Sequence, residues 1–344
     1  MRGEAIIIGA GIAGLAAGRA LLHDGWEVTL YERTEGLPSS GTALGMWPEA
    51  MAALERLDVA DAVQSTGMLQ HGAAFLRPDG SAFARIASKD PAYLISRPAL
   101  HELLYGDALE ANVRWSSAVE DIAALPNADL IVGADGINSR TRHAITDRRN
   151  STRPLGTVAF RGVVPGPVDK ATETWGNGRL FGITPHDAQT TNWFACVRED
   201  VLGEHDGNLP DAELLAELFH GWHSQVTRVV KEADSEQIDR RVLQDSTPLK
   251  SMIRGKTVII GDAAHAMAPN LGRGACEALV DAVRLADALG AAKTIEDGLH
   301  AFDRSRCRAG QRTARVSRLL NRISTARHFA GLRQRTMSAL TRFA

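Results

Sequence analysis

Apolar and polar positions follow two different periods in the first part of the chain. β-Branched apolar residues run together over 5–8, apolar positions recur with helical spacing over 12–23, and they alternate with polar ones over 27–31. This order predicts a strand, a helix and a second strand, which form one βαβ unit of a parallel sheet. Residues 48–57 and 98–109 also have helical spacing, with a proline near the first turn, where a missing N–H is tolerated.

The middle of the chain has the pattern of a β-rich segment. A buried-type strand at 129–132 runs into a glycine turn, and three further strands are predicted at 157–164, 179–183 and 191–197. Turns that contain glycine, proline or Asn-Gly separate them. The segment therefore predicts a mostly antiparallel sheet.

The last part returns to the βα character of the start. Residues 211–232 predict one helix, and residues 257–260 predict a strand of the first lobe, which is therefore discontinuous. Helices are predicted over 275–289 and over most of the chain from 299 onward. One face of the last helix carries apolar residues, which we expect to pack on the first lobe: Val316, Leu319, Leu320 and Ile323.

Length and composition place the chain among ordinary globular proteins. Its 344 residues favour two lobes, and its 44% hydrophobic and 23% charged residues are near globular averages. A net charge of −2 and an aromatic content of 5% give no reason to expect nucleic acid as a partner. No apolar run approaches the roughly 20 residues that span a bilayer, and Glu4 interrupts the apolar N-terminus, so neither membrane insertion nor a secretion signal is expected.

Cysteine and arginine usage adds two further expectations. Cys196, Cys276 and Cys307 are far apart and odd in number, so we expect no disulfide framework, no bound metal and a cytoplasmic location. The segment from Arg304 to Arg342 is rich in arginine and poor in acids. This pattern is typical of a membrane-surface helix or of a packed helix with a solvated arginine face, and we favour the second.

The sequence Gly9-Ala10-Gly11-Ile12-Ala13-Gly14 lies between the first predicted strand and the first helix. In such a turn the first glycine permits the sharp bend, the second lets the backbone approach a pyrophosphate, and the third allows close packing of helix on strand. The N–H groups and dipole of the helix N-terminus favour the anion. The motif predicts dinucleotide binding, and taken alone it allows NAD, NADP or FAD.

Two charged residues follow at the end of the second predicted strand. Glu32, 18 residues after Gly14, is placed to accept hydrogen bonds from ribose hydroxyls. Arg33 either faces the adenine or is a solvated surface residue.

Two further motifs also follow predicted strands. Residues 133–142 read GADGINSRTR, and residues 261–274 read GDAAHAMAPNLGRG. In the second of these a carboxylate follows the strand and a glycine-bearing loop opens a helix, whose N-terminus can stabilise negative charge on a reduced flavin ring.

Together the three motifs resemble those of the class A flavoprotein monooxygenases, which share the p-hydroxybenzoate hydroxylase fold. Order and spacing match from Ile6 to about Ala288, with further matches at residues 41–48 and at Ser96-Arg97-Pro98. The resemblance implies an α/β fold: a Rossmann-like FAD-binding lobe with a parallel sheet, a mostly antiparallel substrate lobe and C-terminal helices. It implies an FAD-binding domain of residues 1–70, 96–155 and 250–298, a substrate-binding domain of 71–95 and 156–249, and a C-terminal helical segment, 299–344.

The resemblance also implies the cofactors and their ligands. FAD is the resident cofactor, and NADPH or NADH visits transiently as the reductant. Glu32 binds the FAD ribose, Arg97 lies along the phosphate and ribityl part, Asp262 holds the ribityl chain, and Asp135 is linked to both FAD and the nicotinamide donor. Pro269 and residues 271–274 border the isoalloxazine. The expected cofactor-binding residues are Gly9, Gly11, Ala13, Gly14, Glu32, Arg33, Arg97, Asp135, Asp262, Gly272, Gly274 and Ala275.

Some positions depart from the family pattern. Arg273 stands where glutamine is usual, and Val280 replaces the usual acid before Asp281, so altered electrostatics beside the flavin are expected, with binding retained. The link between Val113 and Asp129 is short and predicts a trimmed copy of the fold.

The substrate pocket is expected between the FAD lobe and the antiparallel sheet. Residues on or beside the sheet strands are the candidates, with structural packing as the alternative for each: Tyr93, Phe160, Arg161, His186 and Trp193. Pro269, Arg161 and His186 are the candidate catalytic residues. His265 is expected to be a structural part of its loop, and Cys276 a buried small side chain.

The implied reaction uses NAD(P)H and O₂. NAD(P)H reduces FAD, and the reduced flavin captures O₂ as a C4a-hydroperoxide that hydroxylates or epoxidises a small aromatic or polyketide-like substrate. Two alternatives stay open: an FAD-dependent oxidoreductase without oxygen insertion, and a non-catalytic FAD- or ligand-binding protein. The sequence leaves the oligomeric state open.

Overall fold

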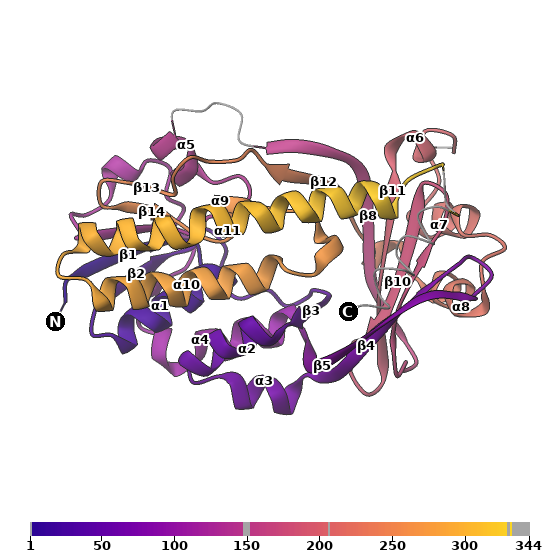
Figure 1. Cartoon of the computed structure of the whole chain (residues 1–344), viewed down its shortest axis with the longest axis horizontal. Helices are drawn as coiled ribbons and strands as arrows, with labels where there is room; N and C mark the ends of the chain where they lie inside the picture. The colour runs from indigo at the N-terminus through magenta and orange to yellow at the C-terminus, as the bar shows by residue number, and fades with distance from the viewer. Residues whose placement is uncertain (1, 147–151, 206, 329–330, 332–344) are drawn as a thin grey trace.

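Two β-sheets, one at each end of the molecule, organise the chain (Figure 1). The computed structural model describes residues 2–146, 152–205, 207–328 and 331. Within these residues, sheet A has the strand order β13-β14-β7-β1-β2-β6, and sheet B has the order β12-β8-β11-β10-β9-β4-β5-β3.

Sheet A is the parallel sheet that the N-terminal pattern predicted. β1 (Glu4–Ile8), β2 (Glu27–Tyr31), β6 (Val113–Arg114), β7 (Leu130–Gly133) and β14 (Thr257–Ile259) pair in parallel, and β13 (Ile253–Arg254) adds an antiparallel edge. Helices cover the sheet, so residues 5–8 of β1 and all of β7 are buried, and these stretches are continuously apolar or small instead of alternating. The predicted βαβ unit is confirmed.

Three long helices pack around this sheet. α1 (Ile12–His23) lies against both α10 (Gly274–Ala291) and α4 (Arg97–Leu109). α4 begins where the long strand β5 ends, and Ser96 caps it by accepting a hydrogen bond from Ala99 N–H at 3.3 Å. The chain therefore passes at this point from sheet B back to the helices that pack around sheet A.

Sheet B is mostly antiparallel, as predicted. Its strands are β3 (Ala43–Met46), β4 (Met68–Leu76), β5 (Ala82–Ser96), β8 (Thr152–Pro165), β9 (Ala171–Trp175), β10 (Arg179–Pro185), β11 (Thr190–Arg198) and β12 (Asp239–Ser246). Among the strand pairs of the described residues in this sheet, only β4 and β9 are parallel. β3 belongs to this sheet although its residues fall in the segment expected to bind FAD; the proposed domain boundaries stay a prediction.

The two faces of sheet B have different neighbours. One face packs against α7 (Asp211–Leu218) and α8 (Ser224–Glu232) through a core that includes Phe160, Phe181 and Trp193. The prediction of a single helix over 211–232 is wrong, because the chain turns between these helices at Gly221, whose φ of 75° is in the left-handed region.

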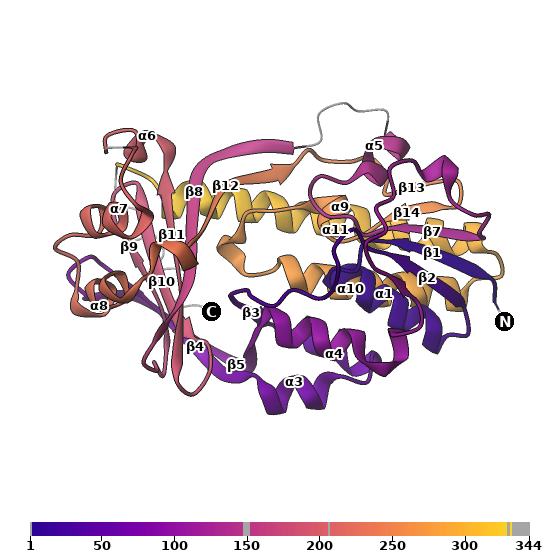
Figure 2. The same ribbon diagram turned by 180° about the vertical axis from the view of Figure 1, so that it is seen from behind.

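The long helix α11 (Ile295–Ser324) runs from sheet A to sheet B (Figures 1 and 2). Its buried side includes small and polar residues such as Gly310, Ser317 and Asn321, which permit close approach to the rest of the molecule. The expected packing face is therefore wrong for three of its four members: Val316, Leu319 and Ile323 are exposed, and Leu320 alone packs against a core cluster.

The remaining helices are short. They are α2 (Pro48–Arg56), α3 (Ala60–Thr66), α5 (Arg140–Thr146), α6 (Glu199–Leu202) and α9 (Asp262–His265), with 3-10 turns at Ile122–Ala124, Ser235–Gln237 and Pro269–Leu271. In the described part of the chain, every helix is too short or too polar to cross a bilayer.

Candidate active site

The glycine turn after β1 lies at the carboxyl edge of sheet A. Gly9 has a φ of 100°, and its N–H donates to Tyr31 O at 2.8 Å. A Cβ on Gly9 would lie 2.5 Å from Ala134 O, and one on Gly14 would lie 1.8 Å from Gly9 O. Both positions therefore require glycine, because a side chain at either would clash with the neighbouring backbone.

Gly11 differs from these two glycines. A Cβ there would meet no atom within 4 Å, so the space beside Gly11 is open. Gly11 is the N-cap of α1 and has no side chain to cap the helix. The first hydrogen bond of the helix runs from Leu15 N–H to Gly11 O, so the N–H groups of residues 12–14 have no acceptor within the helix. An open space beside a helix N-terminus fits a pyrophosphate.

Glu32 lies beside this turn. Its Oε2 accepts a hydrogen bond from Ala10 N–H at 2.7 Å, and its Oε1 accepts one from Thr34 N–H at 2.9 Å. A carboxylate has about four acceptor sites, so capacity for ribose hydroxyls remains. Arg33 next to it is exposed.

Asp135, in the second motif, uses both oxygens within its own turn. Its Oδ1 accepts from Ser139 Oγ at 2.5 Å, and its Oδ2 accepts from Thr141 N–H and Thr141 Oγ1, each at 3.0 Å. The carboxylate therefore shapes the start of α5. Its expected link to FAD and the nicotinamide donor stays a prediction.

Arg142 connects the second motif to the third. This arginine is 1% exposed, and its guanidinium donates to Ala263 O at 3.1 Å, to Ala264 O at 2.8 Å and to Thr247 O. We inferred no role for it from the sequence. Its burial is visible only in the structure, so its place inside the second motif was the signal that the sequence offered.

Asp262 follows β14, after a left-handed Gly261. Solvent reaches its side chain, yet the surrounding protein raises the pKa of its carboxyl, and the positive charges of His265 and Arg97 oppose that shift. Arg97, also exposed, thus lies close enough to act on Asp262 electrostatically. A Cβ on Gly261 would lie 2.9 Å from Ala13 Cβ, which places the third motif against the first.

The loop from Pro269 to Ala275 approaches sheet B. Gly272 is left-handed, with a φ of 60°, and its carbonyl accepts a hydrogen bond from Trp47 Nε1 at 3.3 Å. α10 then begins without a side-chain cap, and a Cβ on Gly274 would meet no atom within 4 Å. Ala275 packs partly against the core. This is a second open helix N-terminus.

Segment 43–47 joins the two halves of the site. The Cys276 thiol donates to Gly45 O at 3.1 Å, and Asn192 Oδ1 of β11 accepts from Ala43 N–H at 3.1 Å. Figures 1 and 2 show β3, the edge strand of sheet B, and the loop before α10 near each other in the middle of the molecule. Burial raises the pKa of Cys276 to about 11, so the buried interpretation of this thiol holds.

A buried ionic network connects the third motif to α10 and α11. His265 Nε2 lies 2.6 Å from Asp281 Oδ2, and Arg306 donates to Asp281 Oδ1 at 2.7 Å and to Glu277 Oε2 at 2.5 Å. Burial alone would lower the pKa of His265, but Asp281 raises it above its usual range. His265 is therefore a structural residue, as expected. Arg273 pairs with Glu49 at 3.2 Å and with Glu277 at 3.5 Å.

The face of sheet B that meets segment 43–47 carries the polar candidates. Cross-strand register places Arg161 opposite Phe194, and Asn192, two residues before Phe194, is on the same face. Glu173 of β9 and Gly182 of β10 continue the row. The Arg161 Nε is buried and has no partner among the described residues.

Three sequence candidates lie elsewhere. Phe160 and Trp193 point to the opposite face, where they are buried in the core under α7 and α8, because side chains alternate along a strand. Tyr93 packs partly against the core of the sheet A lobe. Phe160 and Trp193 are therefore packing residues, whereas Tyr93 is only partly buried and its place at the pocket stays a prediction.

His186 lies at the β10–β11 turn. Its Nδ1 is 2.9 Å from Thr190 Oγ1, and its Nε2 is buried without a partner in the described structure. Pro269 begins its 3-10 turn on the sheet A side. Within the described residues no hydrogen bond or ion pair joins Pro269, Arg161 and His186 to one another.

Comparisons with known proteins decide the family. A family model described as an FAD binding domain matches residues 106–317, and one described as an FAD dependent oxidoreductase matches residues 4–126. "Aurachin C monooxygenase/isomerase" of Stigmatella aurantiaca is 33% identical over 310 residues, which cover 83% of this chain and 80% of that protein. The chain belongs to the class A flavoprotein monooxygenases. The predicted family and FAD cofactor are confirmed.

A further relative and a solved structure are similar to this chain over most of its length. "3-amino-4-hydroxybenzoate 2-monooxygenase" of Streptomyces cremeus is 29% identical over 353 residues, covering 94% of this chain and 87% of the relative. The structure of Klebsiella pneumoniae HpxO complexed with FAD and uric acid has a TM-score of 0.86 at 22% identity, covering 99% of this chain and 93% of that one. The latter confirms the fold.

The residues of this flavoprotein monooxygenase fit FAD. Open space lies beside the uncapped N-termini of α1 and α10, next to Gly11 and Gly274, and a Cβ on Gly136 would also meet nothing within 4 Å. Carboxylates, the acceptors that hydroxyl groups require, are present beside both motifs, at Glu32 and at Asp262. No cluster of potential metal ligands occurs in the part of the chain that the structure describes.

Glu173 is a candidate that the sequence did not reveal. Burial raises the pKa of its carboxyl to about 7, and a hydrogen bond from Trp175 Nε1 opposes that shift. The charges of Glu173 and Arg161 both act on Cys196, which lies on the same face. A carboxyl that titrates near neutral pH can accept a proton during a reaction.

Proposed function

We propose that this protein is an FAD-dependent monooxygenase that uses NAD(P)H and O₂ to hydroxylate or epoxidise a small aromatic substrate with an ionisable ring O–H or N–H. The observation that carries the proposal is the sheet B face with Arg161, Glu173 and Asn192, joined to the 43–47 segment that contacts the Gly272 loop. Urate and aminohydroxybenzoate, named for two relatives, have such groups. We also propose a cytoplasmic location.

Each part of the site has a separate task in this proposal. Bound FAD supplies hydride acceptance from NAD(P)H and activation of O₂. The N–H groups at the start of α1 bind the pyrophosphate, Glu32 binds the ribose, and Asp262 with Arg97 binds the ribityl chain. The start of α10 favours negative charge near Gly274.

The sheet B face orients the substrate and handles its proton. The unpartnered Arg161 Nε donates to an oxygen of the substrate, which fixes the ring. The Glu173 carboxylate accepts the ring proton, which raises the electron density of the ring before oxygen is transferred. His186, with a free buried Nε2, lines the far end of this face as a secondary contact.

The test is the pH profile of Glu173→Gln. Turnover of the FAD-loaded wild type with a phenol or ring N–H substrate should rise through a pKa near 7 as Glu173 loses its proton. The variant should lack this limb and turn over at least about 100-fold more slowly, with FAD content unchanged. Oxygenated product and substrate-stimulated NAD(P)H oxidation are the readouts.

Thr172→Val, one position away on the opposite face of β9, is the matched control and should keep the limb. A Glu173→Gln profile that matches the wild type would remove Glu173 from the mechanism. A flavin that NAD(P)H does not bleach would favour the non-catalytic alternative, and bleaching with oxidised but unoxygenated product would favour the oxidoreductase without oxygen insertion.

A further inference from the structure

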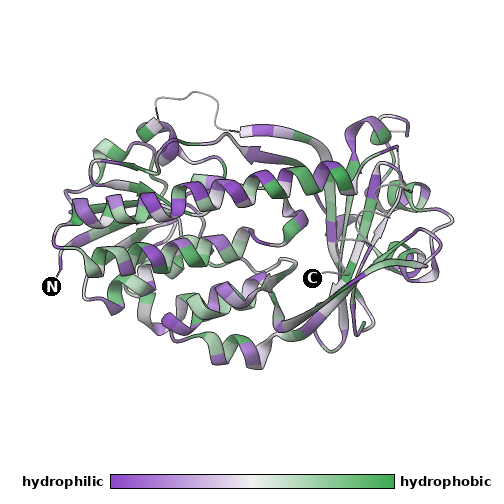
Figure 3. Cartoon of the chain, viewed as in Figure 1, coloured by the Kyte–Doolittle hydropathy of each residue, from purple (hydrophilic) through white to green (hydrophobic). Residues whose placement is uncertain are grey.

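The last turns of α11 expose apolar side chains. Val316 is 47% exposed, Leu319 56% and Ile323 36%. The spacing of three and four residues places them on one stripe of the helix. Six large apolar side chains are exposed in the described structure, and half of them lie on this stripe, so it is a concentrated feature. Figure 3 shows hydrophobic residues in this part of α11, next to sheet B.

A basic pocket of about 420 Å³ lies beside the same helix. Four cations line it: Lys250, Arg308, Arg312 and Arg315, with Leu249 and Gln311 among the other residues. No carboxylate lines the pocket, and within the described residues none of the four cations makes an ion pair. The pocket therefore has a net positive charge and an available set of donors for an anion.

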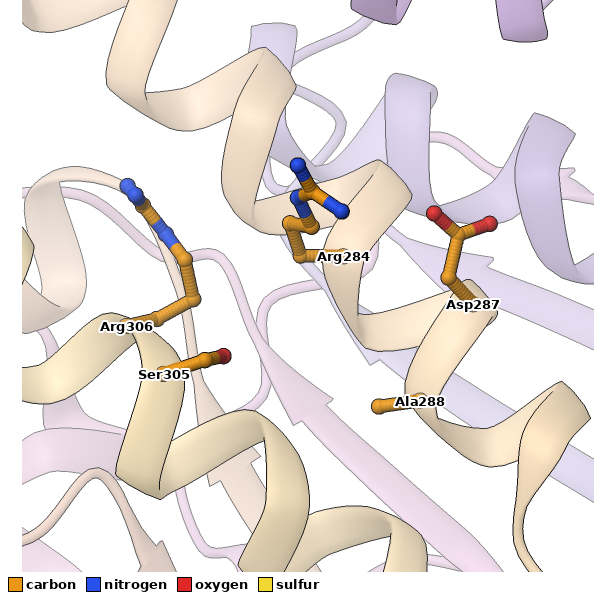
Figure 4. Close-up of a pocket in the computed structure, with 5 residues that line it drawn as sticks. All are labelled: Arg284, Asp287, Ala288, Ser305 and Arg306. Atoms are coloured by element: carbon orange, nitrogen blue, oxygen red, sulfur yellow. The ribbon is translucent and has the colours of Figure 1, made fainter.

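A second pocket of α11 lacks this property. It has a volume of about 470 Å³ and lies between α10 and α11, where Figure 4 shows Arg284 and Asp287 on one helix and Ser305 and Arg306 on the other. Arg306 is already paired with Asp281 and Glu277, and Asp287 adds a negative charge. This pocket is charge-balanced and does not require an anion.

The cations and the apolar stripe share the solvent side of α11. Arg308, Arg315 and Arg322 recur every seven residues, which places them along one line beside the stripe of Val316 and Leu319. No aspartate or glutamate occurs from Arg304 to the end of the sequence. A cationic line next to an exposed apolar stripe has the chemistry of a helix that lies in the headgroup region of a bilayer.

We propose that this surface, Lys250, Arg308, Arg312, Arg315, Val316 and Leu319, docks the protein on an anionic phospholipid bilayer. Lipid phosphates occupy the basic pocket, and the apolar stripe enters between the headgroups. The attraction is local, because the net charge of the whole chain is −2. The proposed docking is peripheral, because no helix in the described part of the chain is long and apolar enough to cross a bilayer.

Co-sedimentation of the full-length, FAD-loaded protein with lipid vesicles tests this proposal. Vesicles of phosphatidylcholine mixed with phosphatidylglycerol should bind the protein, and vesicles of phosphatidylcholine alone should not. Arg308→Gln/Arg312→Gln should weaken binding roughly 25-fold, from about fivefold per cation near an anionic surface. Leu319→Ser should also weaken binding. All variants should retain the wild-type FAD content and melting temperature.

Matched controls separate the docking surface from general charge and hydrophobicity. Lys170→Gln/Lys231→Gln removes the same two charges from exposed positions outside α11, and Val242→Ser removes a side chain that is 56% exposed. Neither should change binding. Equal losses in the control and test variants would overturn the proposal. The proposal would also be overturned if the arginine variant alone lost vesicle binding while Leu319→Ser kept it. Binding of inorganic phosphate at this pocket without any need for a bilayer would overturn it as well, since both results describe a site for a soluble anion.

Discussion

Replacing Gly11 by alanine should have opposite effects on the fold and on FAD binding. Gly11 has a φ of −74° and a ψ of −177°, which alanine adopts without strain, and an added Cβ meets no protein atom within 4 Å. Restricting the unfolded chain at such a position stabilises a protein by about 0.4–1 kcal/mol. The melting temperature of the FAD-free variant should therefore rise by roughly 0.5–1.5 °C, since the unfolding entropy scales with chain length.

The same methyl group should hinder FAD. Pyrophosphate oxygens must come within about 3 Å of the N–H groups that open α1, and the Cβ would project into that space. We expect a loss of at least about tenfold in FAD affinity, or about 1.4 kcal/mol, measured by fluorescence titration of the apoprotein. The holoprotein should therefore lose stability although the apoprotein gains it.

Two comparisons calibrate this prediction. Gly207→Ala, at an exposed position with nothing within 4 Å of the Cβ, should leave FAD affinity unchanged. Gly14→Ala should destabilise the fold itself, because its Cβ would lie 1.8 Å from Gly9 O. The reasoning is refuted if folded Gly11→Ala binds FAD as tightly as the wild type, because the pyrophosphate then lies elsewhere.

Two further predictions concern the support of the third motif. Arg142→Met should lower the free energy of unfolding by about 3 kcal/mol or more in urea, because three carbonyl oxygens lose their buried donor; a loss below about 1 kcal/mol would contradict this role. Asp281→Asn should cost most stability at mildly acidic pH. The fold lowers the pKa of Asp281, so the stability that the Asp281 carboxylate contributes is present above the ordinary carboxyl pKa of 3.8 and is lost as the pH falls through the lowered value. The fold raises the pKa of His265, so the stability that the charged imidazole contributes is present below 6.5 and is lost as the pH rises through the raised value. Urea unfolding at a series of pH values should show the largest difference from wild type between about 4 and 6.5, and a pH-independent difference would count against the ion pair.

The FAD half of the site was largely readable from the sequence, because its chemistry depends on the backbone. Gly9, Gly11 and Gly14 act through the presence or absence of a Cβ at fixed spacing, so their positions alone predict the turn and its open space. The two helix N-termini follow from the same local pattern.

The substrate half was less readable, because it depends on which face of a strand a residue occupies and on register between distant strands. Phe160 and Arg161 are neighbours in sequence, yet one is buried under α7 and α8 and the other faces segment 43–47. Glu173 gains its raised pKa from burial that only the assembled sheet produces. The exposure of Val316 and Leu319 likewise depends on the small residues that pack on the other side of α11.

The most direct test of the proposed function is the origin of the oxygen atom in the product. The FAD-loaded protein should be incubated with NAD(P)H, ¹⁸O₂ and a panel of small aromatic compounds with a ring O–H or N–H, and the products analysed by mass spectrometry. The proposal predicts that a product gains one ¹⁸O atom for each molecule formed. A product that is oxidised without gaining the label, or no oxygenated product from a flavin that NAD(P)H reduces, would contradict it.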